Sequence, residues 1–494
     1  MPKAAPKVTF SADGQEGGSV ATTEGVSKKA RIMVSAAAGL TELKIKTVSD
    51  TLLARGWPAE FDLMKATEAQ KEVLKSNGLL WSENVDKQDT IKSAVWLLFD
   101  DVVKLLSTAP QKTTVSAFEI FAKDRFAQEG DGRFDVKVAP PVFEFVNAPG
   151  EGNVWAKRAV YDVKYVSERE TPVVECRGAD GQWKALETTL TEKNTDEYEC
   201  LAKGLAPATD YAFRVRLGGH TLEAGSYVTE VDAQVPNSGF EEWSEEMVWK
   251  KTIAFSGGKE VYAFYPYASG TTDTWWNTRN RTTTQSSDGV ASWFYAAYPG
   301  TVPTAKSGWT ATEHLNSYGG TNLSSRAYAG NSAMEIATVG WGKNNWSAAS
   351  KTAANKTAGA LYIGDYDLAT HTESFGHAFA SRPVSIQFYY RFYSYNNETT
   401  KAYAELKDET GEVIGYGEFR ITNSTDVYQK GIIEIIYYSQ VKRISTFTIV
   451  FLSTDSESPA TSAIQGSEGA IGKGYGDSRH IGSVLTVDEV ELVY

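Results

Sequence analysis

The chain has 494 residues, 49 Lys and Arg against 62 Asp and Glu, and a formal net charge of −13, with 12% aromatic and 22% charged residues. Its length allows roughly two to four domains with ample core, and its composition is that of a soluble globular protein rather than a disordered or fibrous one. The acidic balance excludes the basic field that nucleic acids and anionic membranes require. No apolar run is long enough to span a bilayer.

The first part of the chain predicts a flexible leader and a small module. Residues 1–27 are rich in Gly, Ser, Thr, Ala and Lys without periodicity, which is typical of a tether. Residues 28–139 then predict an Ig-related α/β module. Its expected elements are strands at 30–35 and 40–47, helices at 62–75 and 91–106, and strands at 115–123 and 134–139.

Pro140 and Pro141 mark a linker, and residues 140–235 predict a second module of short, regularly spaced strands. The segment from Leu205 to Arg216 resembles a fibronectin type III corner, so we expect an Ig/fibronectin III-like sandwich. Both cysteines lie here. Paired, Cys176 and Cys200 would fit an oxidising compartment; unpaired, they would be small buried residues, and both alternatives stay open. The expected strands are 158–166, 173–176, 182–186, 198–202, 211–217 and 227–233.

Residues 236–494 predict one closed β domain. The segment 237–243 opens it, and 482–494, rich in β-branched residues, closes it, so we expect these ends to pair. Further strands are expected at 357–367, 384–395, 432–438 and 444–452. The strand 384–395 is aromatic on both faces, with Phe388, Tyr390 and Phe392 on one and Tyr389, Arg391 and Tyr393 on the other. A second aromatic face indicates a ligand-facing sheet or a contact with the preceding module.

Several segments of this domain occur in a recognisable order. They are NSGFEEW at 237–243, DTWWNTRN at 273–280, SRAYA at 325–329, AGALYIG at 358–364, GHAFASRP at 376–383, IQFYYR at 386–391 and VDEVELVY at 487–494. Together they resemble the putative carbohydrate metabolism domain of Bacteroidetes surface proteins. The resemblance covers about residues 237–494 and implies a jelly-roll β-sandwich similar to carbohydrate-binding modules.

Tryptophans in loop-like surroundings are the candidate ligand residues of this domain. A sugar ring stacks its C–H face on an aromatic face, while nearby amides and guanidinium groups bind its hydroxyls. Adjacent Trp275 and Trp276 point to opposite faces if the chain is extended, so we expect one in the core and one exposed. Alternatively, half or more of these aromatics fill the interior. The predicted ligand-binding residues are Trp275, Trp276, Asn277, Arg279, Trp293, Tyr295 and Trp309.

The acids at the two ends of the domain have a separate interpretation. Sugar-binding jelly rolls that begin and end with similar motifs use one acid from each end to hold a structural calcium ion, and Glu241 and Asp488 match those positions. Ca²⁺ takes six to eight oxygen ligands, which such acids supply. The alternative is two solvated acids at a strand edge.

No catalytic motif is present. The sequence has no H-E-x-x-H, G-x-S-x-G, P-loop or C-x-x-C pattern, and its five histidines are scattered. We interpret His220 as a turn residue and His377 as a core or turn residue. With 62 acidic residues, no spacing singles out a carboxylate pair for glycoside hydrolysis.

The sequence thus predicts a mainly β, multi-domain protein that binds a polysaccharide or oligosaccharide and contributes to polysaccharide capture or utilisation. The family resemblance implies export to the outer-membrane surface or periplasm as a lipoprotein, whose signal and lipid-anchor Cys this sequence lacks. Other outer-membrane surface proteins are expected as further partners. Two alternatives stay open: a glycoside hydrolase or lyase that uses a carboxylate pair, and a structural or adhesive component of a surface assembly.

Overall fold

The computed structural model describes most of the chain, and its contacts divide it into two compact units. Unit 1 comprises residues 1–150, 158–204 and 210–227, and unit 2 comprises residues 151–157, 205–209 and 228–494. The described residues are 4–82, 94–108, 112–253, 256–285, 295–297, 299–304, 327–344, 353–425, 427–461 and 481–494.

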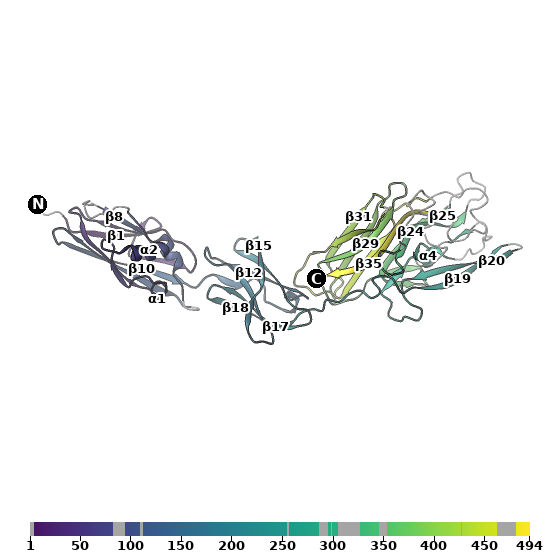
Figure 1. Cartoon of the computed structure of the whole chain (residues 1–494), viewed down its shortest axis with the longest axis horizontal. Coiled ribbons are helices and arrows are strands. Elements are labelled where there is room, and N and C mark those ends of the chain that lie inside the picture. The colour runs from purple at the N-terminus through teal and green to yellow at the C-terminus, as the bar shows by residue number, and fades with distance from the viewer. Residues whose placement is uncertain are drawn as a thin grey trace. The chain divides into compact units, whose positions relative to one another are not determined.

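Two five-stranded sheets form the N-terminal module of unit 1 (Figure 1). Their strand orders are β2-β1-β4-β8-β7 and β3-β10-β9-β5-β6, with mostly antiparallel pairing. The strands are β1 (Lys7–Ala12), β2 (Gln15–Glu16), β3 (Ser19–Thr23), β4 (Ala30–Ser35), β5 (Leu40–Val48), β6 (Glu60–Asp62), β7 (Leu80–Trp81), β8 (Ala94–Leu98), β9 (Thr114–Asp124) and β10 (Glu129–Ala139); the helices are α1 (Asp50–Ala54), α2 (Glu68–Ser76) and α3 (Asp100–Leu105).

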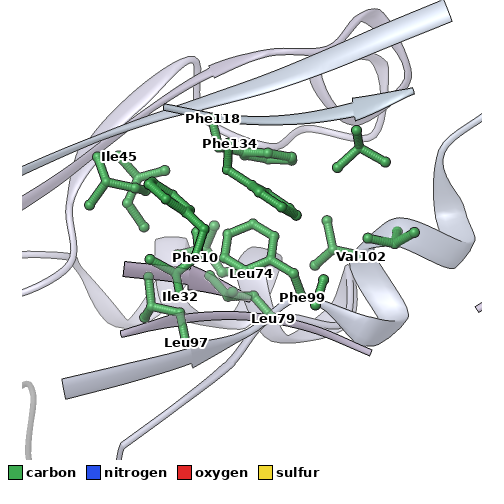
Figure 2. Close-up of a cluster of buried hydrophobic side chains, with 14 of the residues drawn as sticks. Phe10, Ile32, Ile45, Leu74, Leu79, Leu97, Phe99, Val102, Phe118 and Phe134 are labelled. Carbon is green, nitrogen blue, oxygen red and sulfur yellow. The ribbon is translucent and has the colours of Figure 1, made fainter. Parts of the chain in front are cut away.

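The core of this module lies between the two sheets. Figure 2 shows Ile32 and Leu97 from one sheet facing Phe118 and Phe134 from the other, and all four are fully buried. Helices α2 and α3 add Leu74 and Val102 to the same cluster. Burial of these alternating apolar side chains supplies the main driving force for the fold.

Two predictions for this module are wrong. The expected leader, residues 1–27, contains β1, β2 and β3, and Phe10 stacks on Phe134 with ring centroids 5.6 Å apart. The expected helix at 91–106 contains strand β8 before the short helix α3. In β8, Val95 and Leu97 are buried and Trp96 is 37% exposed, which is the period of a strand.

The middle module consists of two four-stranded sheets with the orders β11-β12-β16-β15 and β14-β13-β17-β18. Cys176 on β13 and Cys200 on β16 are free and buried, so the unpaired alternative holds. Burial raises the pKa of the Cys200 thiol to about 12. The last strand runs over 220–228 instead of 227–233. The elements are β11 (Phe143–Phe145), a 3₁₀ turn (Glu151–Asn153), β12 (Arg158–Tyr165), β13 (Val173–Arg177), β14 (Trp183–Ala185), β15 (Glu187–Asn194), β16 (Glu197–Lys203), β17 (Asp210–Leu217) and β18 (His220–Val228).

His220 is not a turn residue as expected but joins the two modules of unit 1. Its Nε2 lies 2.9 Å from Oε2 of Glu24, and the backbone N–H and hydroxyl of Thr108 donate to the same oxygen. Burial acts to raise the pKa of Glu24, but the contacts with His220 and Thr108 lower it overall. The module boundary therefore carries a buried polar cluster.

Unit 2 contains the large domain, a sandwich of an eight-stranded and a seven-stranded sheet with an additional β19–β20 hairpin (Figure 1). The orders are β21-β26-β34-β30-β31-β33, with β27 and β28 at its side, and β22-β24-β35-β29-β32, with β23 and β25 at its side. The elements are β19 (Ser244–Ile253), β20 (Ser256–Tyr265), β21 (Trp276–Thr278), α4 (Asn280–Thr283), β22 (Tyr295–Ala296), β23 (Thr301–Pro303), β24 (Met334–Asn344), β25 (Ala353–Thr357), β26 (Ala360–Asp367), β27 (Thr372–Phe375), β28 (His377–Ala378), β29 (Ser385–Tyr393), β30 (Thr400–Lys407), β31 (Val413–Ile421), β32 (Gln429–Glu434), β33 (Ile436–Tyr437), β34 (Thr446–Leu452) and β35 (Ile481–Val493).

The predicted fold class, mainly β and multi-domain, is confirmed. Within the large domain, β26, β29, β34 and β35 occupy the ranges that the alternation of apolar residues indicated. The opening segment 237–243 forms no strand. It lies beside β35 through a hydrogen bond from the Val490 N–H to the Ser238 carbonyl, and Asn237 and Phe240 adopt the left-handed conformation with φ of 49° and 55°. No helix in the described part of the chain has the length and apolar character needed to cross a membrane.

A buried ion pair organises one end of unit 2. Arg382 and Glu230 have side chains that are 0% and 1% exposed, and Arg382 Nε donates to Glu230 Oε1 at 2.8 Å. The guanidinium also donates to the carbonyls of Gly152, Val154, Gln440 and Lys442. We call this group the Arg382 clasp. It ties the segments 151–157 and 440–442 to the sandwich within one unit.

Candidate functional site

The two adjacent tryptophans differ in burial, but neither is exposed as one of them was expected to be. Trp276 is 1% exposed on β21, packs edge-on against Phe240 with centroids 5.2 Å apart, and donates its indole N–H to the Pro236 carbonyl. Trp275 is half-buried. Trp276 is therefore a core residue, and its place among the predicted ligand residues is corrected; Trp275 keeps its candidacy.

Asn277 and Arg279 are engaged within the protein. Asn277 is 7% exposed, and its side-chain oxygen accepts the Thr278 N–H. Arg279 makes a two-pronged contact with Glu373, with N···O distances of 2.6 and 2.7 Å. Burial acts to lower the pKa of Arg279, but the Glu373 carboxylate raises it overall. Asn277 is thus buried, and Arg279 is half-buried and held in an ion pair.

The remaining predicted aromatics were not placed. Trp293 and Trp309 lie outside the described residues. The backbone of Tyr295 belongs to β22, where it pairs with Lys343 of β24. These three residues stay predictions.

Trp275 is part of an aromatic corner. Its ring stacks on His377 with centroids 4.0 Å apart, and it meets Phe379 edge-on at 5.9 Å. His377 Nε2 lies 3.1 Å from Oδ1 of Asp273, and Phe379 stacks on the buried Phe447 at 5.2 Å. The corner arises because β28 pairs with β34 beside the start of β21. His377 is thus neither a core nor a turn residue but one face of this corner.

Phe379 is also the aromatic wall of a cleft of about 950 Å³ in unit 2. The cleft has the size and the mixed lining of a small-molecule site. Its apolar side is formed by alanines, Ile444 and Phe379, and its polar side by charged and hydroxyl groups. The lining residues are Val231, Ala233, Ala378, Phe379, Ala380, Ser381, Asp408, Glu409, Thr410, Lys442, Arg443, Ile444 and Ser445.

Asp408 is the organising group of the polar side. It stands in the turn between β30 and β31, where its Oδ1 accepts the Thr410 hydroxyl at 2.6 Å, and its Oδ2 lies 3.1 Å from Lys442 Nζ. The Thr410 hydroxyl and the Lys442 ammonium lower the pKa of Asp408 to about 2. The cleft therefore presents a permanent carboxylate acceptor next to an ammonium donor.

Sequence reasoning did not single out the cleft residues. Phe379 lies within the family-like segment 376–383, and Asp408 opens an Asp-Glu-Thr-Gly turn, so both carried a local signal. Their convergence with Lys442 depends on contacts between residues about 30 to 60 positions apart, which no periodicity reveals.

The acids predicted to bind calcium instead hold one loop, Tyr328–Ser332. Asp488 is 0% exposed, and its Oδ2 accepts the N–H groups of Tyr328 and Ala329 at 2.7 and 3.1 Å. Oε1 of Glu241 accepts the N–H groups of Asn331 and Ser332 at 2.9 and 3.1 Å. We call this arrangement the carboxylate clamp.

The clamp does not fit a calcium site. Ca²⁺ takes six to eight oxygen ligands, whereas N–H groups point at oxygens of both carboxylates. Across the described ranges, no group of three or more His, Cys, Asp or Glu side chains is placed to hold a metal ion. The described residues therefore give no support to calcium at Glu241 and Asp488, which rests on the family resemblance alone.

Burial changes the pKa of the Asp488 carboxyl group, and this change makes the stability of the protein depend on pH. Loss of water raises its pKa to about 6, although three backbone N–H groups act to lower it. Because the folded protein then holds this proton more tightly than the unfolded chain, the contribution of Asp488 to stability falls as pH rises from about 4 to about 6. We expect the melting temperature of the wild type to exceed that of Asp488→Asn by an amount that falls as pH rises from about 4 to about 6. Above about pH 6 the difference should stay constant. A constant difference from pH 4 to 8 would contradict this environment.

No protein-family model matches the chain, and no curated protein does either. Among solved structures, it is similar to a putative glycoside hydrolase from Bacteroides thetaiotaomicron, with 14% identity over 70% of this chain and 88% of that chain and a TM-score of 0.28. It is also similar to carbohydrate-binding modules of the β-sandwich superfamily, with 9% identity over 72% and 97% and a TM-score of 0.21. An I9–I11 tandem of titin aligns with 9% identity over 46% and 65% and a TM-score of 0.25. At these scores the superpositions say nothing about function.

Proposed function

We propose that unit 2 binds a carbohydrate in the Phe379 cleft and that the protein contributes to polysaccharide capture or utilisation at the cell surface or in the periplasm. The cleft itself, about 950 Å³ with one aromatic wall and one polar side, carries this proposal. Sugars are recognised by this combination, because their C–H faces stack on aromatic rings and their hydroxyls need both donors and acceptors.

The charges of the cleft suit a neutral ligand. Lys442 is neutralised by Asp408 at 3.1 Å and by Glu412 at 2.6 Å, and Arg443 pairs with Glu151 at 2.7 Å. With Glu409 also on the lining, acids outnumber bases in this group, so the cleft offers hydrogen-bond donors and acceptors but no net positive field for an anion. A sugar hydroxyl can replace a water molecule at these groups without breaking an ion pair. A charged ligand would have to break one.

The same geometry argues against Asp408 as a general acid. A glycoside hydrolase needs one carboxyl group that stays protonated at working pH so that it can act as the general acid. Asp408 is the opposite case, since its hydrogen bonds hold its pKa at about 2. Glu409 is the other carboxyl group on the lining, so the alternative of a hydrolase or lyase stays open.

One observation favours the alternative of a surface-assembly component. The strands β32 and β33 end the two sheets of the sandwich, and this part of the chain exposes several large apolar side chains. Such a patch is typical of a contact surface. The exposed residues are Val427, Ile432, Ile436, Tyr438 and Val441. None of these five residues lines the Phe379 cleft, so a contact surface here is compatible with a glycan-binding role.

The binding proposal is tested on the full chain with a glycan array followed by calorimetry. We expect Phe379→Ala to weaken binding of the best oligosaccharide about tenfold or more, because the variant loses the stacking surface. Phe375→Ala is the matched control, since Phe375 is 41% exposed on β27 and does not line the cleft. Equal affinities for wild type and Phe379→Ala would reject the cleft, and no binding to any glycan would leave the assembly role ahead.

A further inference from the structure

A second aromatic surface lies on the outer face of the seven-stranded sheet. Tyr328 stacks on Tyr389 of β29 with ring centroids 3.6 Å apart and planes 9° apart, and Tyr428 meets Tyr328 edge-on at 5.8 Å. Tyr328 is 46% exposed. A ring that is covered on one face and still nearly half exposed presents its other face to solvent. We call these three residues the tyrosine platform.

The carboxylate clamp sets the position of Tyr328. Two N–H groups of its loop donate to Asp488 and two to Glu241, so two N–H groups are fixed on each side of Gly330, which has a φ of +63°. Glu489, next to Asp488, is held at a φ of 49°, a conformation that costs free energy in a non-glycine residue. Such strain persists only where the surroundings enforce it, so the loop is built to hold this geometry.

Polar groups accompany the platform on the same sheet face. Tyr389 lies opposite Asp488 across β29 and β35, and the adjacent row on this face pairs Arg391 with Thr486. The Arg391 guanidinium lies 4.2 Å from the Tyr428 ring centroid. The Thr486 hydroxyl is buried and has no hydrogen-bond partner within the described ranges. Arg391 and Thr486 are 3% and 1% exposed, so these polar groups support the platform from within the fold and do not face a ligand.

We propose that the tyrosine platform is a second carbohydrate-contact site, at which Tyr328 stacks on the C–H face of a neutral sugar residue of a polysaccharide. Glu241 is a positioning residue that acts through the backbone of the Tyr328 loop. The inference rests on the proposed function but uses residues that do not line the Phe379 cleft. Two contact sites on one chain raise retention on a multivalent ligand such as an insoluble polysaccharide.

The test measures retention of the full chain on the insoluble polysaccharide whose fragments bind best in the glycan array. Wild type, Phe379→Ala, Tyr328→Ala and the double variant are compared. Tyr438→Ala is the control, since Tyr438 is 65% exposed and does not contact the tyrosine platform. We expect Tyr328→Ala to weaken retention about tenfold in both the wild-type and the Phe379→Ala backgrounds. Tyr328→Phe should retain it, because the stacking face is unchanged.

The role of Glu241 is tested by its dependence on Tyr328. Glu241→Gln should lower retention in the Phe379→Ala background but add nothing once Tyr328 is alanine, while calorimetry of the short oligosaccharide at the cleft stays unchanged. A merely structural role would also lower cleft affinity. Retention of Tyr328→Ala equal to that of wild type in both backgrounds would overturn the platform alone. Absence of binding by wild type to every glycan would overturn both proposals.

Discussion

Replacement of Arg382 by alanine is expected to lower the free energy of unfolding of unit 2 by about 3–5 kcal/mol. The substitution leaves Glu230, 5% exposed, as an uncompensated buried carboxylate and removes donors from four carbonyls. It also removes the guanidinium from the Trp155 ring, whose centroid lies 4.3 Å away. Hydrogen exchange of amides in β26 and β34 at increasing denaturant reads out unit 2 within the full chain.

Burial disfavours the charged form of both partners of this ion pair. Loss of water raises the pKa of Glu230 and lowers that of Arg382, so the charged pair persists because of its mutual contact and its carbonyl acceptors. Arg443→Ala is the matched control: its side chain is 50% exposed and pairs with Glu151, so about 0–1 kcal/mol is expected. If both variants were equally mild, the Arg382 clasp would not stabilise the unit.

The Trp276→Ala variant is the second large expected effect, a loss of about 3–5 kcal/mol in the stability of unit 2. Trp276 fills the sandwich between Phe240 and Phe451, with ring centroids at 5.2 and 6.3 Å, and its removal leaves a cavity that the surrounding strands fill only in part. The Pro236 carbonyl also loses its donor. The same hydrogen-exchange measurement on β26 and β34 reports this loss.

The Trp275→Ala variant tests whether the two tryptophans contribute differently to the stability of unit 2. Because Trp275 is half-buried and packs against His377 and Phe379, we expect a smaller loss of stability than for Trp276→Ala. A larger loss for Trp275 than for Trp276 would mean that their assignment to corner and core is reversed.

Alternation of apolar residues predicted several of the strands but missed others, such as β24, β30 and β31. In β29 it placed Phe388, Tyr390 and Phe392 on one face, and the three are buried. This prediction failed where the spacing of apolar residues fits both a helix and a strand. Residues 94–105 contain valines and leucines at both helical and strand spacing, and pairing of β8 with β4 decided in favour of a strand for the first half. Contacts with distant strands override local periodicity.

The leader was misjudged for a related physical reason. Residues 7–23 are rich in small and polar residues, yet β3 pairs with β10, more than 100 positions later, over five residues. Burial of Phe10 between the sheets adds to this pairing. Composition describes what a segment does alone, and this segment is ordered by its partners.

The candidate site was predictable only in part. The rule that neighbouring residues of an extended chain face opposite ways separated Trp275 from Trp276, but it could not show which one was buried. Likewise, the end motifs correctly drew attention to Glu241 and Asp488, whereas their partners in the structure are peptide N–H groups of the Tyr328 loop. Backbone donors carry no side-chain signature, so the carboxylate clamp was not visible in the sequence.

The most direct test of the carbohydrate-binding proposal is a crystal structure of the full chain soaked with its best-binding oligosaccharide. The proposal predicts density for a sugar ring against Phe379, with hydroxyls within hydrogen-bond distance of Asp408 and Lys442, whose side chains form the polar side of the cleft. Sugar density found only away from both the Phe379 cleft and the tyrosine platform would contradict the account.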